Sequence, residues 1–267
     1  MCLPRCPGVP KLPPRVLITG AAGAIGSCLR DGLRPLVDEL VLSDVRAVEP
    51  VAKERFVLAD LDDREAVAGA MQGVDAVIHL GGVSTEKPFD QLVGPNLVGT
   101  FNVFDAARLA GVSRVVFASS NHATGFYPVQ RTLTGYEPTR PDTLYGVTKV
   151  YGEAVGRLYV DKFGLQVICV RIGSFGPRPR QLRELSTWLS YEDAVRLFAA
   201  CLSAPAVDFR VVYGASANTR LFWDLTSARE LGYEPQDDAE RYAADVGEEV
   251  HDLQGGAFTA RDMGGWT

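Results

Sequence analysis

The stretch Val16-Leu17-Ile18-Thr19-Gly20-Ala21-Ala22-Gly23-Ala24-Ile25-Gly26 decides the fold of this chain. Its apolar start predicts a buried strand, and the three glycines that follow predict a tight turn that opens a helix. Glycines let the backbone turn sharply and approach a pyrophosphate closely, and a helix N-terminus offers free N–H groups to phosphate oxygens. The string alone is weak evidence, but the order strand, turn and helix favours a dinucleotide site. The candidate cofactor-binding residues here are Gly20, Gly23, Ala24, Ile25 and Gly26.

Apolar runs of strand length alternate with helical patterns from Arg15 to about residue 213. Continuous apolar strands separated by helices imply a parallel sheet covered on both faces. We therefore predict an α/β fold, a doubly wound Rossmann sheet with helices on both faces and a small C-terminal substrate cap. The expected strands are 16–19, 39–43, 56–58, 76–80, 114–118, 167–170 and 211–213, and the main expected helices are 89–110 and 145–163. Two expected helix caps are Asp62 with Glu65, as a capping box, and Ser190 with Asp193.

The first fourteen residues, Met1 to Pro14, are rich in proline and lack a long apolar core. We expect a disordered leader rather than a signal peptide or membrane span. Residues 15–267 then form a single NAD-binding domain, with a small substrate-binding portion mainly after residue 171. The part of the chain after Lys149 is short, so any cap is small and suits a small substrate.

Composition narrows the class of protein. Of 267 residues, 46% are apolar and 22% charged, as is ordinary for a globular enzyme, and the net charge of −6 argues against nucleic-acid or anionic-membrane partners. The five cysteines, at positions 2, 6, 28, 169 and 201, form no regular framework. Their scatter favours reduced thiols in a cytoplasmic protein over disulfides, and no metal site is predicted.

An acidic residue closes the second expected strand. Asp44 lies 18 positions beyond Gly26, which suits a carboxylate that accepts hydrogen bonds from the adenosine ribose hydroxyls. The same charge would repel a 2′-phosphate, so NAD is favoured over NADP, although Arg46 nearby could compensate a phosphate. After the third strand, Asp60 and Leu61 are candidates to line the adenine pocket, and a plain turn carboxylate is the alternative for Asp60.

A tyrosine and a lysine begin the helix expected at 145–163. Tyr145 and Lys149 are four residues apart and share one helical face, so both can point into one cleft. A phenol is a poor base at neutral pH, but a nearby ammonium favours the phenolate, which could then remove a hydroxyl proton. Tyr-x-x-x-Lys is common by chance; the upstream fingerprint and Ser119-Ser120 at a strand end turn it into a candidate catalytic site.

Together these residues resemble the extended short-chain dehydrogenase/reductases over roughly Arg15 to Gly176. The resemblance implies a catalytic set of Ser120, Tyr145 and Lys149, with Tyr145 and Lys149 also touching the cofactor. It further implies that Leu80, Gly81 and Gly82 pass the cofactor ribose and pyrophosphate, and that Asn96 belongs to the cofactor site. Members often pair through the helices that include the catalytic tyrosine, so a homo-oligomer is expected.

Within that family the chain resembles bacterial uronate dehydrogenases. The strings that carry this are His79-Leu80-Gly81-Gly82-Val83-Ser84-Thr85-Glu86-Lys87-Pro88-Phe89, Phe117-Ala118-Ser119-Ser120-Asn121-His122, Leu144-Tyr145-Gly146-Val147-Thr148-Lys149, Val170-Arg171-Ile172-Gly173-Ser174, Leu185-Ser186-Thr187-Trp188 and Gly214-Ala215-Ser216-Ala217-Asn218. The resemblance implies NAD-dependent oxidation of a hexuronic acid, glucuronate or galacturonate, at C1 to the aldarolactone. The implied sugar-acid contacts are Ser84, Ser120, Asn121, His122, Tyr145 and Arg183.

Two other functions stay open at this point. A sugar-nucleotide epimerase or dehydratase would keep NAD tightly bound and regenerate it each turnover. Many such enzymes carry asparagine three positions after the arginine of Arg-x-x-x-x-Gly-Pro, where this chain has Ser174, and their caps are longer. A non-enzymatic nucleotide sensor would often lack the serine, tyrosine and lysine set, which is present here.

Overall fold

Seven parallel strands form one sheet in the order β3-β2-β1-β4-β5-β6-β9. The computed structural model describes residues 12–205 and 207–262. The strands are β1 (Arg15–Thr19), β2 (Glu39–Asp44), β3 (Glu54–Leu58), β4 (Ala76–His79), β5 (Arg114–Ser120), β6 (Gln166–Ile172) and β9 (Phe209–Gly214). The chain reverses its direction across the sheet between β1 and β4, the kind of place where open α/β sheets bind ligands. The predicted doubly wound Rossmann sheet is thus confirmed.

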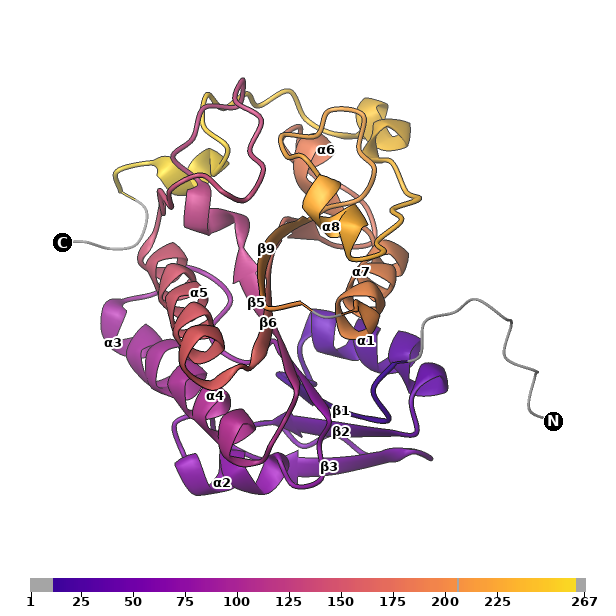
Figure 1. The fold of residues 1–267 in the computed structure, drawn as a ribbon. Helices are drawn as coiled ribbons and strands as arrows, with labels where there is room; N and C mark the ends of the chain where they lie inside the picture. Colours follow the sequence, from indigo (N-terminus) through magenta and orange to yellow (C-terminus); the bar gives the residue numbers. More distant parts are fainter. Residues whose placement is uncertain (1–11, 206, 263–267) are drawn as a thin grey trace.

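Helices cover both faces of the sheet (Figure 1). One face carries α1 (Ala24–Leu33), followed by the short turn η1 (Arg34–Leu36), and α7 (Tyr191–Ser203); the other carries α2 (Arg64–Ala70), α4 (Gly99–Leu109) and α5 (Leu144–Phe163). Alternate residues of β1 enter the two cores, since Ile18 packs with α1 and α7 while Leu17 packs with α4. Complete burial of each such side chain stabilises the fold by about 1.5–3 kcal/mol, which explains the unbroken apolar run of this strand.

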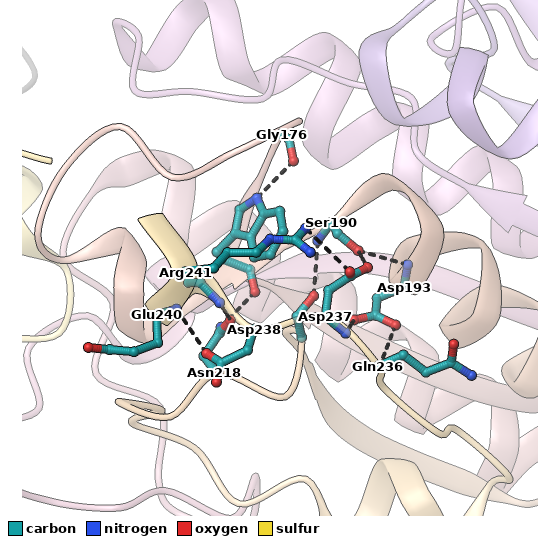
Figure 2. Close-up of polar contacts among 12 residues, drawn as sticks. Gly176, Ser190, Asp193, Asn218, Gln236, Asp237, Asp238, Glu240 and Arg241 are labelled. Carbon is teal, nitrogen blue, oxygen red and sulfur yellow. Dashed lines mark hydrogen bonds and ion pairs between the residues drawn. The ribbon is translucent and has the colours of Figure 1, made fainter. Parts of the chain in front are cut away.

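The chain after β6 builds a smaller layer over one end of the sheet, drawn orange to yellow in Figure 1. It contains β7 (Ser174–Phe175), α6 (Glu184–Thr187), β8 (Trp188–Leu189), α8 (Thr226–Glu230) and the 3₁₀ turns η4 (Ala239–Asp245) and η5 (Gly256–Thr259). Figure 2 shows how the segment before η4 is fixed: the buried Asp193 carboxylate accepts hydrogen bonds from the Gln236 and Asp237 N–H groups, and Ser190 Oγ donates to Asp237. Ser190 also accepts from the Asp193 N–H, so the predicted cap of α7 is confirmed.

Two local predictions need correction. The helix expected at 89–110 is α3 (Phe89–Leu92), a π-helical stretch (Val93–Val98) and α4 in continuous succession. Pro95 lacks an N–H group and crowds the preceding turn, which explains the wider turn there. The expected capping box is also wrong, because Asp63 rather than Asp62 accepts from the N–H groups of Glu65 and Ala66.

The expected disordered leader falls mostly on residues 1–11, which lie outside the described residues. Its last part is ordered, because Leu12 is buried in the core and the Pro14 carbonyl accepts hydrogen bonds from the Asp38 and Glu39 N–H groups. None of the described helices is both long and apolar enough to cross a membrane.

Candidate active site

A single cleft of about 1010 Å³ runs along the carboxyl ends of the central strands. That volume lies at the upper end of the range typical of ligand and cofactor sites. The fold brings to it all but one of the residues singled out from the sequence. These are Gly20, Gly23, Ala24, Ile25, Gly26, Asp44, Asp60, Leu61, Leu80, Gly81, Gly82, Ser84, Ser120, Asn121, His122, Tyr145, Lys149 and Arg183.

The glycine turn forms a cradle that side chains would fill. Gly20 has φ +70°, and a Cβ there would lie 2.8 Å from Gly81 N and 2.9 Å from Leu80 C; a Cβ on Gly26 would overlap Gly20 O. Helix α1 begins directly behind the turn with no side-chain cap and no acidic residue in its first turn. Its positive end therefore stays available to an anion, and the cradle fits the pyrophosphate of a dinucleotide.

Asp44 ends β2 beside this cradle. Its carboxylate accepts hydrogen bonds from the N–H groups of Ala22 (2.9 Å) and Arg46 (3.0 Å), which fix its position. The Arg46 guanidinium donates to Ala22 O (2.7 Å) and lies 3.7 Å from the same carboxylate. Arg46 is thus held as the partner of Asp44, and the carboxylate stands where a ribose would approach.

Asn96 is the predicted cofactor residue that does not line the cleft. It is buried, and its carboxamide accepts from Val83 N (2.7 Å) and donates to Val83 O and to Thr148 Oγ1 (both 3.0 Å). These bonds satisfy the backbone of the loop that carries Ser84 and tie it to α5. In the structure Asn96 therefore supports this loop from behind the cleft, because its carboxamide atoms already form hydrogen bonds with the protein.

Tyr145 and Lys149 lie on the first turns of α5, both side chains buried beside the cleft. Burial raises the pKa of the Tyr145 phenol to about 12; the Ser120 hydroxyl opposes this rise, and the Asp142 carboxylate adds to it. Burial lowers the pKa of Lys149 to about 8. The Lys149 ammonium lies 5.1 Å from the centre of the Phe117 ring and 5.5 Å from that of Tyr145. Burial therefore keeps the Tyr145 phenol protonated in the ligand-free protein, and a positive charge close to its oxygen would lower that pKa.

The N-terminus of α5 is held from two sides. Thr143 Oγ1 accepts from the Gly146 N–H, and the Glu86 carboxylate accepts from the N–H groups of Leu144 (3.2 Å) and Tyr145 (2.8 Å). Glu86 belongs to the loop after β4 that also carries Ser84. No local sequence pattern indicates this cap, because it joins residues almost sixty positions apart.

Behind Ser120 and Tyr145 lies a buried ion pair. Arg171 on β6 donates from Nε and Nη2 to the two carboxylate oxygens of Glu153 on α5, at 2.8 Å each, and Ser119 Oγ donates to Glu153 at 2.6 Å. Breaking a buried pair leaves an uncompensated charge, which is costly. The arrangement therefore holds α5, and with it Tyr145, in register with the end of β5 that carries Ser120.

Arg183 lies at the far end of the cleft, in the turn before α6. With the Asn121 amide oriented to satisfy both of its neighbours, Arg183 Nη2 donates to the Asn121 side-chain oxygen (2.7 Å) and the Asn121 amide nitrogen donates to Ile172 O (3.0 Å). Arg183 Nε donates to Gln254 O (2.6 Å). Burial lowers the pKa of Arg183 to about 10, and the nearby Asp142 and Glu184 charges oppose that fall. The guanidinium is thus fixed in the cleft with donor capacity left for an anion.

His122 follows Ser120 in the turn η3 (Asn121–Thr124). Its Nδ1 lies 2.9 and 3.0 Å from the two oxygens of Asp142, and its ring packs on Phe258 with centroids 4.4 Å apart. Asp142 and Phe258 were not predicted. Neither belongs to a motif, and Phe258 reaches the cleft only because the C-terminal segment folds back, together with Gly255 and Ala257.

Comparisons with known proteins agree with this geometry. A model of the NAD dependent epimerase/dehydratase family matches residues 16–194. The chain is 46% identical to uronate dehydrogenase from Pseudomonas putida over 87% of each chain, and 39% identical to NAD-dependent glucose-6-phosphate dehydrogenase from Haloferax volcanii over 85% of this chain and 95% of that one.

Among solved structures, a mutant of uronate dehydrogenase from Agrobacterium tumefaciens complexed with NAD matches with a TM-score of 0.88 and 42% identity, over 92% of this chain and 96% of that one. The family match spans β1 to β6, which are six of the seven strands of the sheet, together with the glycine cradle and the Tyr145–Lys149 pair. This chain therefore belongs to the NAD dependent epimerase/dehydratase family.

Proposed function

We propose that this protein is an NAD-dependent uronate dehydrogenase that oxidises glucuronate or galacturonate at C1 to the aldarolactone. The observation that carries the proposal is the fixed guanidinium of Arg183, which lies with Asn121 in the same cleft as Tyr145. A uronate differs from a neutral sugar by one carboxylate, and a planar guanidinium binds a carboxylate through two parallel hydrogen bonds. The similarity to uronate dehydrogenases over most of the chain supports the same substrate class.

In this reaction each residue of the cleft has a separate role. Bound NAD⁺ supplies the acceptor for the hydride that leaves C1. Ser120 orients the C1 hydroxyl, and Tyr145 removes its proton as the C1–O bond becomes the carbonyl of the lactone. Lys149 favours the phenolate of Tyr145 by its charge and would hold the nicotinamide ribose. Ser84, Asn121 and His122 supply hydrogen-bond partners for the remaining hydroxyls.

The cradle and the sheet edge would hold the cofactor. The helix α1 N-terminus would face the pyrophosphate, Asp44 would hold the adenosine ribose, and Asp60 and Leu61 would line the adenine pocket. The Asp44 carboxylate repels a 2′-phosphate, which favours NAD over NADP. Leu80 and Gly81 pass beside Gly20, and Gly82 lines the same cleft.

The protein would assemble as a homo-oligomer and work in the cytoplasm. Exposed apolar side chains on α4 and α5 support self-association, Leu109, Leu158 and Phe163 among them. The three cysteines in the described part of the chain, Cys28, Cys169 and Cys201, are free thiols, as in a reducing compartment.

The test is formation of NADH absorbance from NAD⁺ with galacturonate or glucuronate. We expect stoichiometric NADH and lactone, and Tyr145→Phe should reduce kcat by about 10²–10⁴-fold while NAD⁺ binding persists. Cofactor that copurifies with the protein and turns over a sugar nucleotide without net NADH would instead establish the epimerase alternative. Absence of turnover with both uronates would overturn the proposal.

A further inference from the structure

Asp142 lies where three segments that are distant in sequence meet. Its side chain is fully buried, with both carboxylate oxygens within 3.0 Å of His122 Nδ1, and the Thr143 hydroxyl donates to it at 3.2 Å. Its own N–H group donates to His122 O at 3.3 Å. Backbone and side chain of Asp142 therefore both fix the residue that the resemblance assigns to the sugar acid.

Two glycines close around this carboxylate. A Cβ added to either Gly125 or Gly255 would overlap Asp142 Oδ2, and the Gly255 N–H donates to Gly125 O at 2.9 Å. A side chain at either position would therefore displace the Asp142 carboxylate. Gly255 belongs to the C-terminal segment, which Gln254 anchors through its side-chain bonds to Pro128 O (3.1 Å) and Arg131 O (2.7 Å).

The position of the proton on His122 follows from this enclosure. An ionised carboxylate only accepts hydrogen bonds, so the contact requires a hydrogen on Nδ1. In the neutral imidazole, Nε2 then carries the lone pair. Among buried side-chain polar atoms of the described residues, only His79 Nε2 lacks a partner. His122 Nε2 is not one of these buried atoms, and it forms no hydrogen bond with the described residues. It is therefore open to the cleft that His122 lines.

Aromatic neighbours hold the plane of the ring. Phe258 packs against it at 4.4 Å between centroids, and Tyr145 meets it edge-on at 6.0 Å. The other fixed side chain at this end of the cleft, Arg183, has only donors. A hydroxyl of a substrate whose carboxylate Arg183 holds needs an acceptor for its own hydrogen, and a neutral His122 with a free Nε2 provides one.

We propose that Asp142 is a positioning residue for substrate recognition: it keeps the proton on His122 Nδ1 and so presents Nε2 as a hydrogen-bond acceptor to a hydroxyl of the substrate. This rests on the proposed function for the identity of the substrate. It goes beyond that function because it assigns the direction of one hydrogen bond and names the residue that sets it.

The first experiment measures the tautomer directly. The chain has three histidines, so ¹⁵N-histidine labelling gives three imidazole signals, and His122→Gln identifies one of them by its loss. At the alkaline end of a pH series we expect the His122 signals of a neutral ring with hydrogen on Nδ1. Hydrogen on Nε2 would overturn the proposal, whether or not Asp142→Asn folds.

The second experiment compares Asp142→Asn with a matched buried carboxylate, Asp105→Asn, on α4 away from the cleft. The side-chain amide that Asp142→Asn introduces can donate to Nδ1, which moves the hydrogen to Nε2. We expect Asp142→Asn to shift the His122 signals and raise the KM for galacturonate by about tenfold, the loss of one hydrogen bond, with NAD⁺ binding unchanged. Asp105→Asn should alter stability alone. An unchanged KM and unchanged His122 signals in Asp142→Asn would overturn the proposal.

These results separate this proposal from the proposed function. The tautomer is measured without substrate or turnover, so failure to oxidise uronates leaves that measurement intact. Conversely, a protein that oxidises uronates with the hydrogen of His122 on Nε2 keeps its proposed function and loses the assigned role of Asp142.

Discussion

The Glu86 carboxylate accepts a hydrogen bond from the backbone N–H of Tyr145 at 2.8 Å, and so ties the loop after β4 to helix α5, which carries the Tyr145 phenol. A second bond from the Leu144 N–H makes this a two-point cap of α5. A negative charge at this end of a helix also interacts favourably with the helix dipole. The loop that carries Ser84 and the helix that carries Tyr145 are thus positioned as one unit.

Replacing Glu86 should therefore affect stability and catalysis together. We expect Glu86→Ala to lower the free energy of unfolding by about 1 kcal/mol, as loss of a helix cap does, and to lower kcat. Denaturant unfolding and steady-state kinetics measure both. Glu65→Ala, an exposed residue of the first turn of α2 whose carboxylate is not the cap, is the control. Unchanged kcat in Glu86→Ala would show that the cap does not position Tyr145.

The buried Lys149 ammonium should lower the free energy of unfolding of the ligand-free protein. Burial lowers its pKa from 10.5 to about 8, so between these pH values the unfolded chain holds a proton that the folded chain has released. The free energy of unfolding therefore rises with pH through that window, and below about pH 8 the folded protein bears the full cost, about 3 kcal/mol.

It follows that Lys149→Met should stabilise the ligand-free protein at pH 7 while it abolishes most of the turnover. Lys162 is an exposed lysine in the last turn of the same helix, so Lys162→Met should change neither the stability nor the turnover. Thermal unfolding of protein stripped of cofactor, followed from pH 7 to pH 10.5, is the measurement. If Lys149→Met is less stable than the parent protein at pH 7, the buried ammonium does not destabilise the folded state.

Asp44 should set the choice between NAD and NADP. We expect Asp44→Ala to reduce kcat/KM with NAD⁺ by about tenfold or more through the lost ribose contacts, and to raise the relative rate with NADP⁺. Arg46, now paired with Asp44 at 3.7 Å, would be released to meet the 2′-phosphate. Asp38 lies just before the start of the same strand, so Asp38→Ala should leave the ratio of kcat/KM with NAD⁺ to that with NADP⁺ unchanged. An unaltered cofactor ratio in Asp44→Ala would exclude this role.

Arg183 should act on the carboxylate of the substrate and not on the rest of the sugar. We expect Arg183→Met to lower kcat/KM for galacturonate by about 100-fold, since the ion is left without its partner, and to leave the low rate with galactose unchanged. Arg178→Met, a nearby exposed arginine outside the cleft, serves as the control. Equal losses for both sugars would mean that Arg183 supports the fold of the cleft instead.

Features set by neighbouring residues could be predicted from the sequence. Three such features depend on contacts within a short stretch or within one strand–helix–strand unit. They are the glycine turn after β1, Asp44 at the end of β2 and the Ser190 cap of α7. The Tyr145–Lys149 pair follows from helical spacing. The π-helical stretch within the helix expected at 89–110 depends on Pro95, a helix-disfavouring residue that the periodic apolar pattern concealed.

Contacts between distant segments could not be predicted in the same way. Glu86 reaches the start of α5, and Asp142 reaches His122, without any periodic pattern to indicate the pairing. Phe258 lies 136 positions beyond His122 and joins the cleft only through the fold of the C-terminal segment. The role expected of Asn96 differs from its place in the structure, because its carboxamide serves the Val83 backbone, which has no strand partner.

The most direct test of the proposed function compares two sugars that differ only in one carboxylate. Initial rates of NADH formation with galacturonate and with galactose, at equal concentrations and saturating NAD⁺, give the ratio of kcat/KM. We predict a preference for galacturonate of about 100-fold or more, the contribution of a fixed guanidinium to an anion. Equal rates with the two sugars, or a preference for galactose, would contradict the assignment of Arg183 to the substrate carboxylate.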